Sequence, residues 1–434
     1  MKAAVSSFRA SLDRTQATLA RWLAPGTPSQ QNNALNLYRE IAWYGVTASV
    51  TTTFTSVFAL RLGASNLLIG LLASLPALMN VVFQIPAARL IEQTQDRRRV
   101  LLMSGLWMRL PVGLIALVPF FAGHWQAEAV VLITSLGTIP AAVANVVFTA
   151  MLADVVPPHR RARVVSVRNT LLSAVTMLTA LAVGKALDLF VFPFSYQAIF
   201  ALAFATSLVS LFYLARVDVP LHIPSPAPRL LSGWSDIQRW MRSVWDQRAF
   251  SRFTLGSFVF HWALSFPQPL YSIYRVRVLG MSEGWIGALS MLESAIFMAS
   301  YYVWGKAAEK HGSRLVLLVG TAGLSFYPLS MGLCRSIPPM ILVAVLSGVA
   351  APAFNLGLFN ALLEVAPAER RATYVAIFNT LVNLTAFIAP LVAAALAGVI
   401  GTRVSLLLAG GLRFVGLAVF YLLLRDPVTG RVRS

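Results

Sequence analysis

The stretch "VPPHRRARVVSVRNTL", residues 156–171, decides the fold because the chain carries it twice. A close copy, "APAERRATYVAIFNTL", occupies residues 366–381, and 10 of 20 positions are identical between residues 152–171 and 362–381. Residues 63–75 and 280–292 match at 6 of 13 positions. Residues 88–97 and 305–314 share a glutamate and an arginine, at Glu92/Glu309 and Arg97/Arg314. The chain is therefore predicted to consist of two copies of one structural unit.

The composition predicts a helical membrane protein. Of the 434 residues, 57% are hydrophobic and 12% are charged, whereas soluble domains have about 25% charged residues. A helix needs about 20 apolar residues to cross a bilayer, and these runs are continuously apolar, unlike barrel strands. The predicted spans are residues 41–62, 66–88, 100–121, 129–153, 164–187, 193–215, 253–274, 283–304, 315–334, 339–362, 372–398 and 404–424.

The basic residues predict the orientation. Most of the 35 Lys and Arg residues fall in the loops of one face, although the formal net charge is +19 overall. By the positive-inside rule, both termini are cytoplasmic in a cytoplasmic (plasma) membrane protein. The excess charge is thus explained without a nucleic-acid partner. The opposite loops contain only Arg61, Lys185, Arg275, Arg277, Arg335 and Arg403.

Five segments are expected along the chain. Residues 1–40 form a cytoplasmic amphipathic arm, or alternatively a disordered tail. A six-helix unit (41–215), a cytoplasmic linker with an interfacial helix near 234–245 (216–252), a second six-helix unit (253–424) and a cytoplasmic tail (425–434) follow. Because six is even, both units insert with the same topology and are related by an axis along the membrane normal.

These features together resemble the major facilitator superfamily of secondary transporters. Its loop signature reads roughly Gly-x-x-x-Asp-Arg-x-Gly-Arg-Arg, and Gly305, Glu309, Gly312 and Arg314 match it in the second unit. The first copy is degraded, with Ala88 and Gln95 at the glycine positions. The resemblance implies an all-α fold of twelve transmembrane helices in two pseudo-symmetric six-helix bundles. The span-four arginine of many proton-driven members and the span-five Gly-Pro motif of drug antiporters are missing, which disfavours a multidrug antiporter.

The resemblance places spans one, four, seven and ten around a central cavity. The repeat aligns two amides, Asn145 and Asn355, that can donate to and accept from a polar ligand; the alternative is a helix–helix contact. Span seven adds His261, Gln268 and Tyr271. The threonine run at 51–55 is expected to bond mostly to its own backbone.

Glu293 is predicted to take up and release a proton, because it is the one acidic residue identified well inside a span. His261 is its expected neighbour, and a static hydrogen-bonded carboxyl is the alternative. Arg109 and Arg413 lie mid-span, where bonds to backbone carbonyls are favoured over a role in holding an anionic substrate. Arg168 is expected at the interface between the units, within reach of Glu293.

The cytoplasmic loops are predicted to carry ion pairs that hold the units together and break as the cytoplasmic side opens. Anchoring to anionic lipids needs only the same charges and is compatible with this role. The predicted gating residues are Glu92, Arg97, Asp154, Arg160, Arg161, Gly305, Glu309, Gly312, Arg314, Arg370 and Arg371.

The predicted function is secondary transport of a small molecule by alternating access, with proton coupling left open and efflux favoured over uptake. The alternatives are a lipid or lysolipid flippase of the same fold and a non-transporting membrane sensor. No nucleophile–base cluster, metal-ligand spacing or nucleotide-binding loop is present, so neither an enzyme nor a cofactor is expected; Cys334 is the one cysteine. Expected partners are the substrate, a proton and membrane lipids, with the chain as a monomer.

Overall fold

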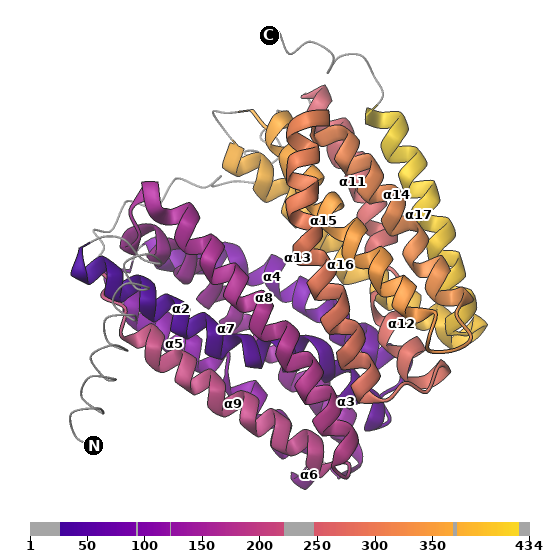
Figure 1. The fold of residues 1–434 in the computed structure, drawn as a ribbon, viewed down its shortest axis with the longest axis horizontal. Helices are drawn as coiled ribbons and strands as arrows, with labels where there is room; N and C mark the ends of the chain where they lie inside the picture. The colour runs from indigo at the N-terminus through magenta and orange to yellow at the C-terminus, as the bar shows by residue number, and fades with distance from the viewer. Residues whose placement is uncertain (1–26, 93, 122, 221–246, 368–370, 425–434) are drawn as a thin grey trace, which may run out of the picture.

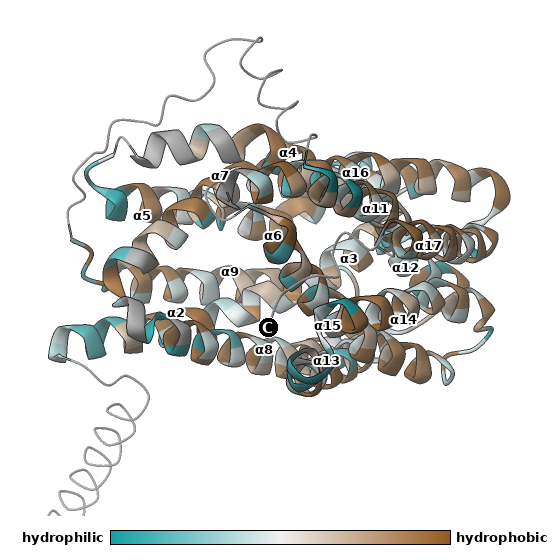
Figure 2. Ribbon diagram, turned by 90° about the horizontal axis from the view of Figure 1, so that it is seen from above, coloured by the Kyte–Doolittle hydropathy of each residue, from teal (hydrophilic) through white to brown (hydrophobic). Residues whose placement is uncertain are grey.

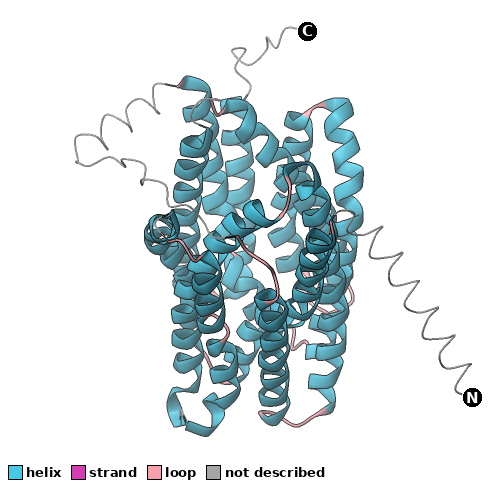
Figure 3. Cartoon of the chain, turned by 90° about the vertical axis from the view of Figure 1, so that its left-hand side faces the viewer, coloured by secondary structure: helices cyan, strands magenta, loops and turns pink. Residues whose placement is uncertain are grey.

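The computed structural model describes residues 27–92, 94–121, 123–220, 247–367 and 371–424, and these residues contain helices and no strands (Figure 3). We call residues 28–215 the N half and residues 248–424 the C half. The N half contains α2 (Pro28–Ser49), η1 (Val50–Phe54), α3 (Thr55–Arg61), α4 (Asn66–Glu92), α5 (Arg97–Trp107), α6 (Leu110–Phe121), η2 (Gly123–Trp125), α7 (Gln126–Val155), α8 (Pro158–Leu189) and α9 (Phe194–Ala215).

The C half repeats this pattern of long helices. It contains α11 (Arg248–Ser265), α12 (Gln268–Ile273), η3 (Tyr274–Val278), α13 (Glu283–His311), α14 (Ser313–Leu333), α15 (Met340–Val365), α16 (Arg371–Ile400) and α17 (Thr402–Leu424). Ten of the described helical segments are long and apolar enough to cross a membrane. The predicted spans 41–62 and 253–274 are not among the ten. In the structure each of these two spans consists of several helical segments.

The first and seventh spans are each interrupted. A π-helical turn, η1, connects α2 to α3 at the threonine run, and a second one, η3, ends the span that α11 and α12 begin. Between α11 and α12, Pro267 cannot donate a backbone hydrogen bond. Turns of this kind re-aim side chains and occur often at functional sites. Both interruptions lie beside the cavity described below.

The first helix begins earlier than predicted. Thr27 caps α2 through a capping box with Gln30, and Pro28 occupies the first turn. Asn33 and Asn36 donate to the carbonyls of Asp218 and Arg216. The predicted arm boundary at residue 40 is therefore wrong, because residues 28–40 belong to the helix that continues into the first span. The amphipathic face predicted before residue 27, the interfacial helix near 234–245 and the tail from residue 425 lie outside the described residues.

The two halves meet along two helix pairs. Helix α4 packs against α16, and α8 packs against α13. In Figure 1 the halves lie closest near α3 and α12 and spread apart toward the opposite ends. Figure 2 shows that hydrophobic residues make up much of the length of the long helices. The end where the halves converge contains Arg61 and Glu283 and is called the Arg61 end; the other is called the Asp154 end.

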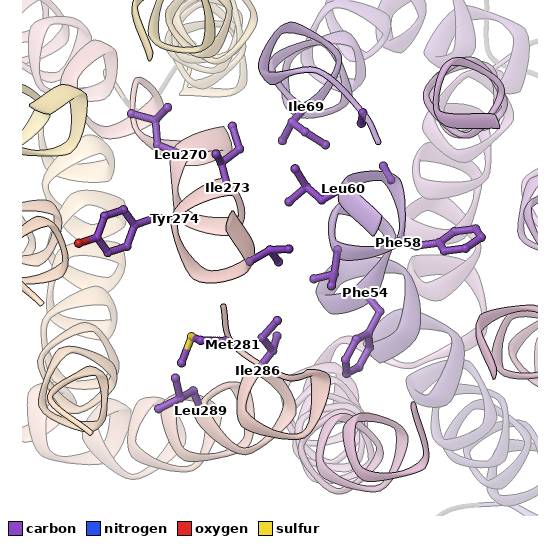
Figure 4. Packing of buried hydrophobic residues seen from close by; sticks show 14 of the residues in the cluster. Phe54, Phe58, Leu60, Ile69, Leu270, Ile273, Tyr274, Met281, Ile286 and Leu289 are labelled. Carbon is purple, nitrogen blue, oxygen red and sulfur yellow. The ribbon is translucent and has the colours of Figure 1, made fainter. Parts of the chain in front are cut away.

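An apolar cluster joins the halves near the Arg61 end. Phe58, Leu60 and Ile69 come from the N half, and Leu270 and Ile286 come from the C half (Figure 4). All five are at most 6% exposed. Burial of apolar surface contributes about 25 cal/mol per Å², so this cluster favours the state in which the halves touch here.

Candidate functional site

A central cavity of about 440 Å³ lies between the halves. The N half contributes Thr52, Thr53, Ser56 and Val57 from the first interrupted span. The C half contributes polar side chains of α12, η3, α13, α14, α15 and α17, which are Gln268, Tyr271, Ser272, Arg275, Ser290, Glu293, Tyr327, Ser347, Asn355 and Arg413. The volume is in the usual range for sites that bind small molecules.

Two arginines and two tyrosines form one wall of this cavity. Nη2 of Arg413 donates to the hydroxyl of Tyr271 at 2.7 Å, and Nη2 of Arg275 donates to the hydroxyl of Tyr327 at 3.0 Å. The two tyrosine rings meet edge to face, with centroids 4.9 Å apart. The contacts orient both phenols and fix the positions of both guanidinium groups.

The remaining donors of Arg413 are used by the backbone. They bond to the carbonyls of Ala263, Leu264 and Leu324, and the residue is 1% exposed. Arg109 has a similar environment, donating to the carbonyls of Gly105 and Ser207 and to the hydroxyl of Ser210. Both arginines therefore have the carbonyl contacts that the sequence analysis favoured.

Glu293 lies in the central cavity, but His261 does not pair with it. The hydroxyl of Ser347 donates to the Glu293 carboxylate. The ring of His261 instead contacts the carbonyl of Ser257 at 2.8 Å and packs against Phe354. The expected Glu293–His261 contact is wrong because the histidine faces the helix interface between α11 and its neighbours rather than the cavity.

The two aligned amides lie in different cavities. Asn355 lines the central cavity, whereas Asn145 lines a second cavity of about 430 Å³ whose described lining residues all belong to the N half. Of these two amides, a ligand in the central cavity would thus contact only Asn355 in this state. Gln268 and Tyr271 lie in the central cavity as predicted.

The second cavity is built around an acid that the sequence analysis missed. Glu40 is 4% exposed and forms a salt bridge with Arg168, at 3.0 Å between Oε2 and Nη2. The Arg168 guanidinium also lies 4.2 Å from the ring centre of Phe148. The predicted approach of Arg168 to Glu293 is therefore wrong, because its carboxylate partner is on α2. The hydropathy pattern places Glu40 just before the first predicted span, so the residue was predicted to belong to the cytoplasmic arm.

Shared side chains link the two large cavities through two smaller ones. Thr52 and Gln268 border the central cavity and a cavity of about 230 Å³. Thr134, whose buried hydroxyl has no hydrogen-bond partner, borders that cavity and one of about 200 Å³. Arg109 borders the last of these and the second cavity. Thr51 and Thr52 do bond to their own backbone, as predicted, yet they also form part of this polar path.

The hydrogen bonds described between the halves all lie at the Arg61 end. Arg61 and Glu283 form a two-point ion pair, with Nε–Oε1 at 2.8 Å and Nη2–Oε2 at 3.2 Å. The hydroxyl of Tyr196 donates to the same carboxylate at 2.9 Å. Arg277 donates to the side chain of Asn66 at 2.7 Å. These residues were not among the predicted gating residues, although Arg61 and Arg277 were among the few basic residues of the opposite loops.

A carboxylate also caps a helix across the same junction. Asp188, at the end of α8, accepts from the backbone N–H of Gly284 at 3.0 Å and from the hydroxyl of Ser282 at 2.9 Å. Acidic groups at a helix N-terminus satisfy free N–H groups and complement the helix dipole. This contact therefore fastens the N half to the start of α13.

Glycines bring the helices of the two halves together at this junction. A Cβ on Gly184 would lie 2.5 Å from the carbonyl oxygen of Glu283. A Cβ on Gly287 would collide with the carbonyl oxygen of Ala180. On the other pair, a Cβ on Gly70 would lie 2.6 Å from Ala394. Only residues without a side chain permit the observed approach.

The predicted gating residues lie at the Asp154 end. Arg97 pairs with Asp154 at 2.7 Å, and Nη1 of Arg160 donates to Gln30 at 3.0 Å, in both cases within the N half. Arg161 donates to the carbonyl of Val156 at 3.4 Å.

In the C half, Glu309 and Arg314 are exposed, and Gly312 has a φ of 84°, which explains a glycine between α13 and α14. Gly305 has open space where a Cβ would lie. The side chains of Glu92 and Arg371 and the whole of Arg370 lie outside the described structure.

Comparisons with known proteins agree with this architecture. The family model for the Major Facilitator Superfamily matches residues 41–291 and 253–434. No curated protein sequence matches the chain.

Three solved structures illustrate the likeness in fold. A bacterial homolog of the human lysosomal transporter Spinster, inward-facing and unoccupied, is 14% identical, with a TM-score of 0.69, over 92% of this chain and 98% of that one. A mutant of the nucleoside transporter NupG is 13% identical, with a TM-score of 0.71, over 90% and 100%. A POT family transporter in complex with 5-aminolevulinic acid is 13% identical, with a TM-score of 0.67, over 90% and 94%. The resemblance found in the sequence is confirmed: the chain is an integral membrane protein that belongs to the major facilitator superfamily.

Proposed function

We propose that the protein is a secondary transporter that carries a small polar molecule across the cytoplasmic membrane by alternating access. In this proposal, twelve spans form two bundles that rock about the central cavity. One observation carries it: the cavity is lined by both halves, and the halves converge and are joined by hydrogen bonds at the Arg61 end (Figure 1). Breaking that junction would expose the same cavity to the other side.

The proposal assigns the Asp154 end to the cytoplasm because the basic loops lie there, and the structure then corresponds to the state closed to the outside. The similar Spinster homolog is described as inward-facing, which supports this assignment. Efflux is favoured over uptake as the physiological direction. Proton coupling through Glu293 is part of the proposal, and the cavity location of that carboxylate supports it.

Flux into proteoliposomes tests the proposal. Uridine, 5-aminolevulinic acid and D-xylose probe polar substrates, and a fluorescent lysophosphatidylcholine probes the flippase alternative. We expect uptake of at least one polar probe above empty liposomes, and loss of that uptake in Gln268→Ala but not in Gln197→Ala, which lies outside the described cavities. Binding without flux for every probe would favour a sensor, and movement of the lysolipid alone would favour a flippase.

Proton coupling has its own readout. An imposed pH gradient should accelerate wild-type flux of the transported probe, whereas Glu293→Gln should make the rate independent of the gradient. Glu128→Gln, a carboxyl in the first turn of α7 outside the described cavities, is the matched control. An unchanged pH profile in Glu293→Gln would remove Glu293 from coupling.

A further inference from the structure

The charged groups of the central cavity differ in how their hydrogen-bonding capacity is used. Arg413 directs its donors at three carbonyls and a tyrosine hydroxyl. Arg275 donates from Nη2 to Tyr327, and its Nε is buried with no hydrogen-bond partner. A buried donor without a partner costs about 1–3 kcal/mol, and more when it is charged. Arg275 is therefore the cavity cation that a ligand acceptor would satisfy.

The position of Arg275 is set by the irregular backbone around it. It lies in η3, the π-helical turn that ends the seventh span, and the first interrupted span places Thr52 and Thr53 of η1 around the same cavity. Tyr327 holds one side of the guanidinium in place. The planar group is thus oriented in advance, which lowers the entropic cost of binding a carboxylate by two parallel hydrogen bonds.

Glu293 provides an acidic group in the same cavity. Its carboxylate accepts from Ser347 on α15, and no salt bridge joins it to Arg275 within the described residues. A cation and an anion in one cavity without a direct pair are both incompletely compensated. An anionic ligand would satisfy Arg275 alone, and a cationic ligand would satisfy Glu293 alone. A ligand that carries both charges satisfies both residues.

We propose that the central cavity binds a zwitterion, with its carboxylate on Arg275 and its ammonium group on Glu293. Gln268, Asn355 and the hydroxyls of Thr52, Thr53 and Ser56 then contact the polar groups between the two charges. This proposal rests on the proposed transport function and adds the chemical class of the substrate. Arg275 and Glu293 are binding residues in this scheme, and Tyr327 is a positioning residue for Arg275.

Equilibrium binding to purified protein in detergent tests the proposal without requiring transport. The probes are ω-amino acids with one to seven methylene groups. Each is compared with two singly charged analogues of the same chain length, a carboxylate without the amino group and an amine without the carboxyl group. We expect at least one zwitterion to bind about tenfold or more tightly than either singly charged analogue, which is the effect of one charge-assisted pair.

The variants assign each charge to its residue. Arg275→Gln should remove the preference for carboxylate-containing probes, whereas Arg275→Lys should retain part of it. Glu293→Gln should bring the zwitterion down to the affinity of the carboxylate analogue. Tyr327→Phe should weaken all carboxylate-containing probes while leaving the amine unaffected. Arg335→Gln, an exposed arginine in the loop before α15, is the matched control, and elution as a single monodisperse species shows that each variant is folded.

Three results would overturn the inference: equal binding of zwitterion and amine, unchanged zwitterion binding in Arg275→Gln, or no binding of any zwitterion at millimolar concentration. Flux of the best-bound probe into proteoliposomes separates this inference from the function it rests on. Charge-dependent binding without flux keeps the zwitterion site and rejects the transporter. Flux that is indifferent to the probe's charges keeps the transporter and rejects the zwitterion site.

Discussion

Glu40 and Arg168 form a buried charge pair whose partners are both needed. Their side chains are 5% and 17% exposed, and Glu40 also accepts from Ser210 at 3.3 Å. Glu40→Gln leaves Arg168 without its counter-charge, a change that costs about 3–5 kcal/mol in buried pairs. We expect a lower unfolding midpoint in detergent than for wild type or Glu128→Gln. The double variant Glu40→Gln/Arg168→Gln should recover part of the loss, and a loss equal to the sum of the single variants would contradict the pairing.

The residues that sequence could and could not predict differ in a physical way. Mid-span Arg109 and Arg413 were expected to bond to carbonyls, because a guanidinium in a low-dielectric region must be satisfied nearby. Glu40 was missed because Asn33 and Asn36 lower the hydropathy of the same helix. The partner of Arg168 depends on which helices pack side by side. Packing is set by the whole fold and leaves no local pattern around residue 168.

Helices α8 and α13 cross where Gly184 meets Gly287, and we expect this contact to help to keep the Arg61 end closed. Gly287→Ala places a methyl group against the carbonyl of Ala180 and near Cα of Gly184, at 3.2 Å. We expect the helices to separate, the closed state to lose population and flux of the best probe to fall severalfold. Gly411→Ala, where a Cβ meets open space, should stabilise α17 by about 1 kcal/mol without changing flux. Equal flux in wild type and Gly287→Ala would show that the crossing tolerates separation.

Long runs of apolar residues predicted the ends of most helices to within a few residues, but they did not predict where helices are interrupted. A hydropathy window averages over the threonine run and over Pro267, so it reports one span where the chain has several segments. Whether the backbone adopts a π-helical turn depends on which neighbouring groups satisfy the displaced carbonyls. Arg275 was therefore predicted to lie in a loop on the face opposite the cytoplasm, whereas η3 places it beside the cavity.

At the scale of the whole molecule, the apolar spans, the duplication and the loop signature predicted the fold class and the family. They did not predict which of the alternating states the chain adopts. A repeat makes the halves alike, whereas the state depends on contacts between them, such as Arg61 with Glu283. This contact joins residues that are 222 positions apart in the sequence. Gating was therefore predicted at the loop motifs, while the described bonds across the halves lie at the opposite end.

The Arg61–Glu283 pair is expected to set the balance between the two states. Glu283→Gln removes the carboxylate shared by Arg61 and Tyr196, and an ion pair of this kind contributes about 1 kcal/mol, or roughly fivefold in population.

A cysteine introduced at Ile69 reports opening through its reaction with a membrane-impermeant maleimide, because Ile69 is 1% exposed in the closed state. The background is Cys334→Ser, which removes the native cysteine. We expect labelling from the outside to accelerate severalfold in Glu283→Gln and to stay unchanged in Glu364→Gln, an exposed carboxyl at the other end. Equal labelling in all three proteins would show that the apolar cluster and the glycine crossing close this end without help from the ion pair.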